Sequence, residues 1–226
     1  MFKIIKTQIK ILSILFLGVI SFSSHAQDSN LGNWFMYIGN KKINSKWNIH
    51  NEIQYRNYNA IGDLEQLLLR AGVGHNLTEN NNNILLGYGY ILSKNYSEST
   101  EDKSLVNEHR VFQQFTTKQS IGNIKLSHRY RFEQRFVEDD FKLRFRYFLS
   151  LNIPFKQSID SKNPLYFSAY NEIFLNSETS IFDRNRLYGG LGYKLNNNIK
   201  IELGYMNQFF ETKSRDQINF ITFVNF

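Results

Sequence analysis

The chain contains no cysteine, and beyond residue 22 it has no apolar run long enough to form a membrane-spanning helix. The absence of cysteine excludes disulfides and thiolate metal sites, so the fold must be stable without them. The excess of positive charge is mild: the chain has 27 basic and 20 acidic side chains, and three of the lysines lie within residues 1–26. No nucleic-acid-binding motif is present, and we expect neither a nucleic-acid partner nor a cofactor.

The one long apolar run lies at the N-terminus. Three lysines, at positions 3, 6 and 10, precede the apolar residues 11–22, and the small residues Ser24 and Ala26 follow. This order is typical of a cleaved secretory signal peptide. A transmembrane anchor is the alternative, but the run is shorter than the roughly 20 residues that a spanning helix needs. We therefore expect a signal peptide over residues 1–26 and a single exported domain over residues 27–226.

Aromatic residues are abundant, with 20 Phe and 13 Tyr, and charged residues are spread between them. In residues 141–155 every odd position is apolar, whereas Lys142, Arg144 and Arg146 occupy even positions. Successive side chains of a strand point to opposite faces, so this alternation predicts a long strand with one apolar and one charged face.

Similar alternating segments fill the rest of the chain. Residues 124–136 precede the segment just described after a short polar turn, which predicts a long antiparallel hairpin. The other connections are rich in Asn, Ser, Gly and Asp, which suit tight turns. The candidate strands are 32–40, 46–57, 64–77, 84–95, 106–118, 123–137, 141–156, 165–176, 184–195, 199–211 and 216–226.

Two-faced strands of this kind suit a membrane barrel. The apolar faces would contact lipid and the charged faces would line the interior, and closure is required because each unpaired amide in hydrocarbon costs several kcal/mol. About ten residues of alternation between turns is the pattern of outer-membrane barrels. We predict an all-β, antiparallel, up-and-down transmembrane β-barrel in the cell outer membrane. A soluble lipocalin-like binding barrel, with its apolar faces inward, is the alternative.

The C-terminal segment ends in Phe226 and resembles the signal that the barrel assembly machinery reads in bacterial outer-membrane barrels. We therefore expect that machinery and outer-membrane lipid as partners. Eleven segments are recognisable, but single-chain bacterial barrels have an even strand number. Counting back from Phe226 places loop 212–216 outside the cell and turn 196–198 in the periplasm, and the first segment then starts on the wrong side. We therefore expect ten or twelve strands.

Several stretches resemble a known family when taken together. They are NEHRVFQQF (107–115), LSHRYRFEQRF (126–136), LRFRYFLSL (143–151), NEIFLN (171–176), FDRNRLYGGLGYKL (182–195) and IELGYMNQF (201–209). They are similar to the uncharacterised domain-of-unknown-function family 2490, which is common in Bacteroidetes-type bacteria and is regarded as a family of outer-membrane barrels. The resemblance covers nearly the whole exported domain and implies the barrel and its location. It implies no activity.

The charged faces make the predicted interior basic. The candidate basic cluster is Arg129, Arg131, Arg135, Arg144, Arg146 and Arg186, and the candidate acids are Glu52, Glu133 and Glu172. One interpretation is a structural barrel stiffened by internal ion pairs. The other is a narrow, porin-like pore or site for a small anionic solute, because a guanidinium group binds two oxygens at once. Ten to twelve strands give a backbone radius of roughly 10–12 Å, so inward side chains leave a narrow gap or none.

An outer-membrane lipid-acting enzyme, of the deacylase or phospholipase type, is a further alternative. His109 and His128 are its candidate bases, but Ser127 and His128 are neighbours on one strand and face opposite sides. No GxSxG or HExxH motif is present, and we assign no catalytic or metal-binding residue. Glycines at alternate positions, such as Gly87 and Gly89, are expected to make room for bulky neighbours rather than to bind phosphate.

Overall fold

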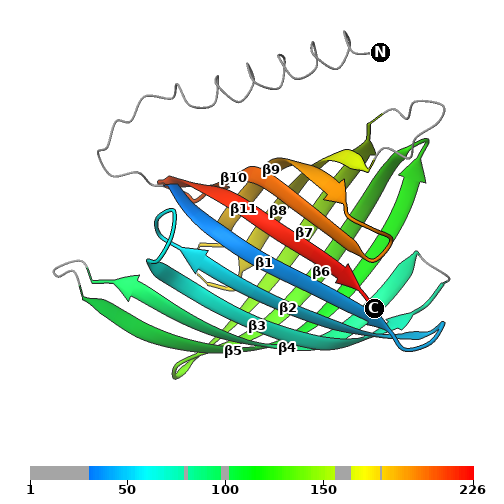
Figure 1. Ribbon diagram of the computed structural model, residues 1–226. Coiled ribbons are helices and arrows are strands. Elements are labelled where there is room, and N and C mark those ends of the chain that lie inside the picture. The colour runs from blue at the N-terminus through cyan, green and yellow to red at the C-terminus, as the bar shows by residue number, and fades with distance from the viewer. Residues whose placement is uncertain (1–30, 79–80, 98–101, 156–163, 179) are drawn as a thin grey trace, which may run out of the picture.

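The computed structural model describes residues 31–78, 81–97, 102–155, 164–178 and 180–226. The expected signal peptide lies outside the described residues. Within them, no helix is long and apolar enough to cross a membrane. Eleven strands form one closed barrel (Figure 1): β1 (Leu31–Lys42), β2 (Trp47–Asn57), β3 (Leu64–Asn76), β4 (Asn82–Tyr96), β5 (Lys103–Ile121), β6 (Ile124–Val137), β7 (Asp140–Pro154), β8 (Leu165–Asn176), β9 (Phe182–Lys194), β10 (Ile199–Phe209) and β11 (Ser214–Asn225).

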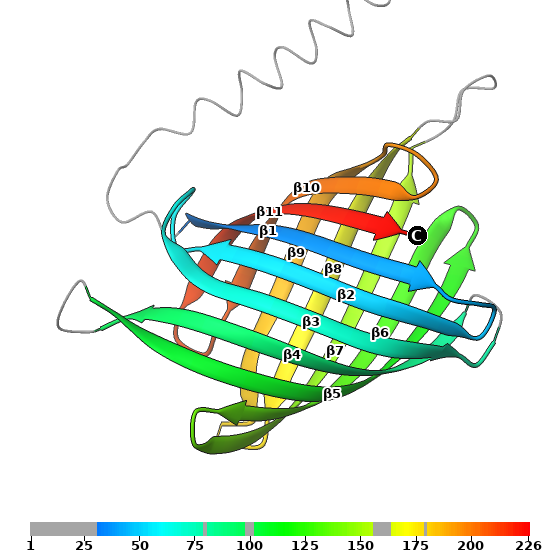
Figure 2. The ribbon, with the colours of Figure 1, turned by 60° about the horizontal axis from the view of Figure 1, so that its bottom comes forward.

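The barrel closes through one parallel strand pair. Every strand pairs antiparallel with its neighbour in the sequence, whereas β1 pairs parallel with β11, from Leu31 opposite Asp216 to Asn40 opposite Asn225. Both views show β1 and β11 side by side and pointing the same way (Figures 1 and 2). This seam corrects the expected strand number of ten or twelve. All eleven predicted segments are strands, and the parallel pair removes the need for an even number.

The strand ends define two rims. We call the end where β2, β4, β6, β8 and β10 finish the Tyr58 rim, because Tyr58 directly follows β2. The other end, where β11 finishes before Phe226, is the C-terminal rim. Because the strand number is odd, β1 starts at the Tyr58 rim and the chain ends at the opposite one.

The two faces of the sheet have inverted polarity. On β7, Phe141 and Phe145 are 58% and 40% exposed, whereas Arg144 and Arg146, at even positions, face the lumen and are 5% and 4% exposed. Each of the eleven strands carries at least two large apolar side chains that are exposed on the outside. This is the opposite of the lipocalin-like arrangement, in which the apolar faces point inward.

Side chains fill the middle of the lumen. Every strand contributes an inward side chain that is at most 6% exposed: Trp34, Gln54, Leu68, Ile91, Phe112, Arg131, Arg146, Phe174, Tyr188, Met206 and Asn219. Several of them form an apolar cluster behind the parallel seam, where Trp34 and Met36 pack with Tyr188, Met206 and Ile221. We call the eleven side chains the plug. Small barrels are commonly filled in this way.

Glycines make room for the aromatic rings inside the barrel. The ring of Phe112 lies against Gly87, and that of Tyr166 lies against Gly192, so closely that a Cβ atom on either glycine would overlap the ring. The expected role of these alternating glycines is thereby confirmed.

We predict that Gly87→Ala lowers the free energy of unfolding by about 1–3 kcal/mol, because the added methyl group overpacks the lumen against Phe112. Urea unfolding in lipid vesicles measures the change. Gly189→Ala is the matched control, since its Cβ would meet only Phe167 at 3.9 Å. Equal stability of the two variants would contradict the packing of the ring on Gly87.

Candidate functional site: an arginine-lined cavity

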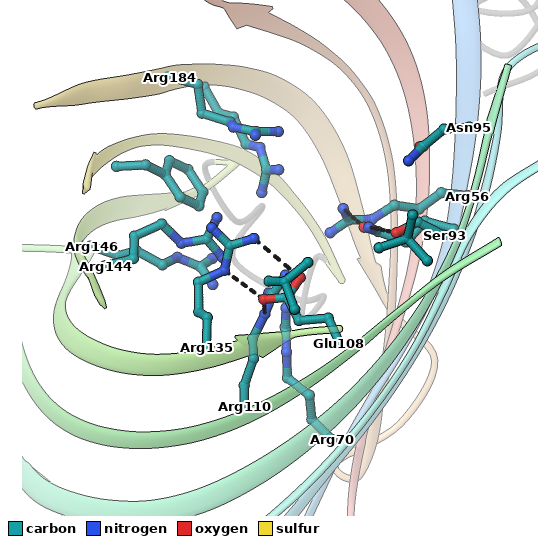
Figure 3. A pocket seen from close by; sticks show the side chains of 15 residues that line it. Arg56, Arg70, Ser93, Asn95, Glu108, Arg110, Arg135, Arg144, Arg146 and Arg184 are labelled. Atoms are coloured by element: carbon teal, nitrogen blue, oxygen red, sulfur yellow. Dashed lines mark hydrogen bonds and ion pairs between the residues drawn. The ribbon is translucent and has the colours of Figure 1, made fainter. Parts of the chain in front are cut away.

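A cavity of about 220 Å³ lies inside the barrel near the Tyr58 rim (Figure 3). One carboxylate, that of Glu108, is among the residues that line it. Neutral side chains on the wall include Gln66, Ser93 and Asn95. Eight arginines complete the charged part of the lining: Arg56, Arg70, Arg110, Arg135, Arg144, Arg146, Arg184 and Arg186.

The period of two along each strand brings these arginines together. Arg144 and Arg146 on β7 are two residues apart and therefore point to the same side of the sheet, as do Arg184 and Arg186 on β9. Closure of the barrel then places walls that are distant in sequence opposite one another. Figure 3 shows Arg56 of β2 across the cavity from Arg144 and Arg146.

Two buried carboxylates, those of Glu133 and Glu172, hold the arginines of β7 in place. Glu133 is 0% exposed, and its Oε2 accepts a hydrogen bond of 2.7 Å from Arg144 Nη2 while its Oε1 accepts one of 2.7 Å from Arg146 Nη1. Arg146 Nη2 also donates to Glu172 Oε1 at 2.6 Å. Arg146 therefore joins the carboxylates of β6 and β8 in one continuous chain of ion pairs.

Two more carboxylates hold the arginines on β3, β5 and β6. Glu108 accepts bonds from Arg110 Nε at 2.6 Å and from Arg135 Nη2 at 3.1 Å. Glu52 accepts a bond from Arg70 Nη1 at 2.7 Å. Charge-assisted bonds of this kind fix the orientation of each guanidinium group.

The cavity retains an excess of positive charge. The carboxylates that contact its eight arginines number five among the described residues: Glu52, Glu108, Glu133, Glu172 and Asp183. At least three positive charges are therefore left over. In addition, the buried Arg70 Nε, Arg131 Nη1 and Trp34 Nε1 have no hydrogen-bond partner. Of these three residues Arg70 lines the cavity, so its Nε is a donor that an anion bound there could use.

The candidate residues from the sequence all lie in the lumen, but only some line the cavity. Arg135, Arg144, Arg146 and Arg186 line it. Arg129 and Arg131 lie outside that lining, with their guanidinium groups 4.3 and 4.4 Å from the rings of Phe148 and Phe112. The three candidate acids are buried: Glu52, Glu133 and Glu172.

Sequence reasoning missed Glu108, Arg110 and Arg184. The alternation around the first two is interrupted by Phe112, an aromatic residue on the inward face. Glu108 and Arg110 are charged and occupy alternate positions before Phe112, and this pattern could have identified them as inward residues. Phe226 lies at the C-terminal rim, where its backbone N–H donates to the carbonyl of Asn40 at 3.0 Å.

The candidate histidines lie on the outer face of the barrel. His109 Nδ1 is 2.5 Å from the hydroxyl of Tyr88, and His128 Nδ1 is 2.8 Å from the hydroxyl of Tyr147. Neither histidine lines the cavity. Within the part of the chain that the structure describes, neither histidine forms a hydrogen bond with a serine hydroxyl, so the Ser–His pair of a lipid-acting enzyme is not found at these two positions.

A charged cluster holds the Tyr58 rim at the β2–β3 connection. Lys103 forms an ion pair with Asp63, and the hydroxyl of Tyr96 donates to Asp63 Oδ2 at 2.8 Å. Burial would raise the pKa of Asp63, but the hydrogen bonds from Lys103 and Tyr96 outweigh it and lower this pKa below its usual value. Asp63 therefore stays ionised and keeps the connection fixed beside the mouth of the barrel.

Residues 31–219 match the family described as "Protein of unknown function (DUF2490)". The chain belongs to this family. The match begins with β1 and ends within β11, so it includes every residue that lines the cavity of this DUF2490 barrel.

Two further similarities were found. An uncharacterised protein of Methylorubrum extorquens strain AM1 is 29% identical over 170 residues, which cover 72% of each chain. Among solved structures, LpxR from Salmonella typhimurium matches with a TM-score of 0.44 and 10% identity, covering 83% of this chain and 85% of LpxR.

We predict that Glu133→Gln lowers the free energy of unfolding by about 3–5 kcal/mol, because it leaves Arg144 and Arg146 with less compensation in a buried site. Asp139→Asn, in the exposed turn between β6 and β7, is the control and should change stability by less than about 0.5 kcal/mol. The measurement is equilibrium unfolding in lipid vesicles. A loss at Glu133 no larger than that at Asp139 would rule out a stabilising role for this network.

Proposed function

We propose that this protein is an integral outer-membrane β-barrel that binds a small anionic solute in its arginine-lined cavity. The observation that carries the proposal is the cavity wall, where eight arginines and one glutamate meet around about 220 Å³. Guanidinium groups that are already held in place bind carboxylate or phosphate oxygens with little loss of conformational freedom.

The exposed apolar surface supports the membrane location. Soluble monomers rarely expose contiguous apolar patches above a few hundred Å², whereas here exposed apolar side chains come from every strand around the barrel. Exposed aromatic residues lie near both rims, with Tyr55 and Tyr205 towards the Tyr58 rim and Trp47 and Tyr193 towards the C-terminal rim. This is the position of the aromatic girdles in outer-membrane barrels.

We further propose the route and orientation of the chain. The segment 1–26 would direct export and be removed, and the barrel assembly machinery would recognise the terminal strand with Phe226. A periplasmic C-terminus then places the Tyr58 rim, and the cavity, on the outer side of the membrane. Outer-membrane lipid would contact the apolar face.

The plug favours binding over open conduction. Since all eleven strands contribute buried side chains to the middle of the lumen, this structure supports a porin-like pore less well than a blind cavity. A purely structural barrel is the second candidate. It is favoured by the ion-pair chain from Glu133 through Arg146 to Glu172, which ties three strands together irrespective of any ligand.

We predict saturable binding of inorganic phosphate or sulfate to the purified, folded barrel, and none of glucose. Isothermal titration calorimetry measures the binding, which should weaken as the salt concentration rises because charges are being paired. In planar bilayers the same preparation should show no sustained conductance. Heat signals that do not differ between phosphate and glucose would favour the structural barrel, and steady channel currents would contradict the plug.

Orientation has its own test in whole cells. An epitope inserted after Ile61, an exposed residue of the β2–β3 connection, should bind antibody on intact cells. The same epitope inserted after Asn197, in the β9–β10 connection, should bind only after the cells are permeabilised. The reverse pattern would mean that the cavity opens towards the periplasm.

A further inference from the structure

Arg56 differs from the other arginines of the cavity in its partners. Its Nε donates to Gln54 Oε1 at 3.0 Å and its Nη1 donates to Gln66 Oε1 at 2.7 Å. Both partners are neutral amides, and Arg56 forms no ion pair with any described carboxylate within 4.0 Å. The side chain is nevertheless only 7% exposed. Its charge is therefore buried with little compensation, which is costly.

Arg186 is nearly as poorly compensated. Its Nη1 is 3.6 Å from Glu172 Oε2, and its Nε donates to the neutral Gln208 at 2.9 Å. Glu172 is shared, because it already accepts closer bonds from Arg129 and Arg146. The remaining negative charge available to Arg186 is consequently small.

The two guanidinium groups share one aromatic ring. The central carbon of Arg56 lies 3.7 Å from the centroid of the Trp34 ring, and that of Arg186 lies 4.8 Å from the same centroid. The two carbons are therefore at most 8.5 Å apart, and the charges repel one another. Trp34 is 2% exposed, and its Nε1 is a buried donor without a partner. Arg56 and Arg186 both line the cavity, and Trp34 lies directly beside them, so three groups that favour negative charge come together at this place.

We propose that Arg56 and Arg186 form the seat for a phosphate-type group, meaning a tetrahedral oxyanion with two negative charges. The proposal rests on the anion-binding function above and names the ligand class and the residues. Two guanidinium groups with little compensation call for two negative charges, and a single carboxylate supplies only one. Tetrahedral oxygens point in several directions, so one group can bridge both arginines, each through its planar fork.

The rest of the cavity would then position the seat and limit the size of the ligand. Arg110 and Arg135 are occupied by Glu108, and Arg144 is occupied by Glu133 and Asp183. A cavity of about 220 Å³ has room for more than one oxyanion group. The phosphate-type group can be free in solution, or it can belong to a lipid headgroup that reaches the cavity from the Tyr58 rim.

Trp34 provides a direct probe of the seat. The chain has two tryptophans, and Trp47 is exposed on the outer face near the C-terminal rim. In a Trp47→Phe background, the emission of Trp34 reports on the seat alone. Titration with inorganic phosphate or sulfate should change this emission saturably, with an affinity at least tenfold tighter than that for acetate.

Charge-removing variants in the same background locate the binding groups. Arg56→Gln and Arg186→Gln should each weaken phosphate binding at least tenfold, and Arg56→Lys, which keeps the charge but loses the fork, should fall between them and the parent. Lys194→Gln removes one positive charge at the C-terminal rim and should leave the affinity within twofold. The heat-dependent shift of the folded barrel in gel electrophoresis confirms folding of each variant.

Vesicles of different lipid composition show whether the phosphate-type group is a free anion or a lipid headgroup. We would compare vesicles of phosphatidylcholine alone with vesicles that also contain phosphatidic acid, whose headgroup is a phosphate monoester. A free anion is the source if phosphate shifts the Trp34 emission equally in both. A lipid headgroup is the source if phosphatidic acid alone produces the shift and added phosphate has no further effect.

The seat and the wider function fail in different ways. Calorimetry could detect phosphate binding while the Trp34 emission stays constant and Arg56→Gln binds phosphate like the parent. That result would contradict binding at Arg56 and Arg186, but it would remain consistent with anion binding elsewhere in the cavity. If no oxyanion binds the parent protein, both proposals fail.

Discussion

The buried chain of ion pairs from Glu133 through Arg146 to Glu172 is the interaction on which the rest of the barrel depends. A sheet with an apolar outer face must turn its charged face inward, where arginines are costly unless carboxylates reach them. Glu133 and Glu172 each pair with three arginines, so the network spans β6, β7 and β8 while leaving the lumen positively charged. That surplus distinguishes this interior from one in which charges merely cancel.

Much of this arrangement follows from the sequence. Alternation along residues 141–155 and its counterparts predicts the position of each of the eleven strand segments, the polarity of both faces and the inward direction of Glu52, Glu133 and Glu172, because side-chain direction is a local property of a strand. The strand number was misjudged because it depends on how the first and last strands meet, and the parallel β1–β11 pair has no local sequence pattern. Glu108 and Arg110 were missed because the inward Phe112 interrupts the alternation, and Arg184 is the first residue of the predicted strand 184–195, where the alternation is only beginning. The cavity joins β2 to β9 across the lumen, a proximity that no single segment encodes.

The plug and the cavity divide the lumen into a filled middle and an open, basic end. Aromatic rings seated on glycines fill the middle, as Phe112 does on Gly87, while the space towards the Tyr58 rim stays open and basic. A ligand could therefore enter from one side and remain there, which suits recognition better than passage. Within that space most arginines already have carboxylate partners, so selectivity would come from Arg56 and Arg186 beside Trp34.

The central claim is that lipid surrounds the apolar faces and the charged faces line a filled lumen. Since the chain has no native cysteine, single cysteines along β7 can each carry a spin label in the barrel reconstituted in lipid. The account predicts that collisions with lipid-dissolved oxygen alternate with a period of two, high at Phe145, Leu149 and Ile153 and low at Ser150 and Asn152. A protein that stays soluble and monomeric without lipid, with labels at Phe145 and Leu149 immobilised and shielded from oxygen, would contradict it.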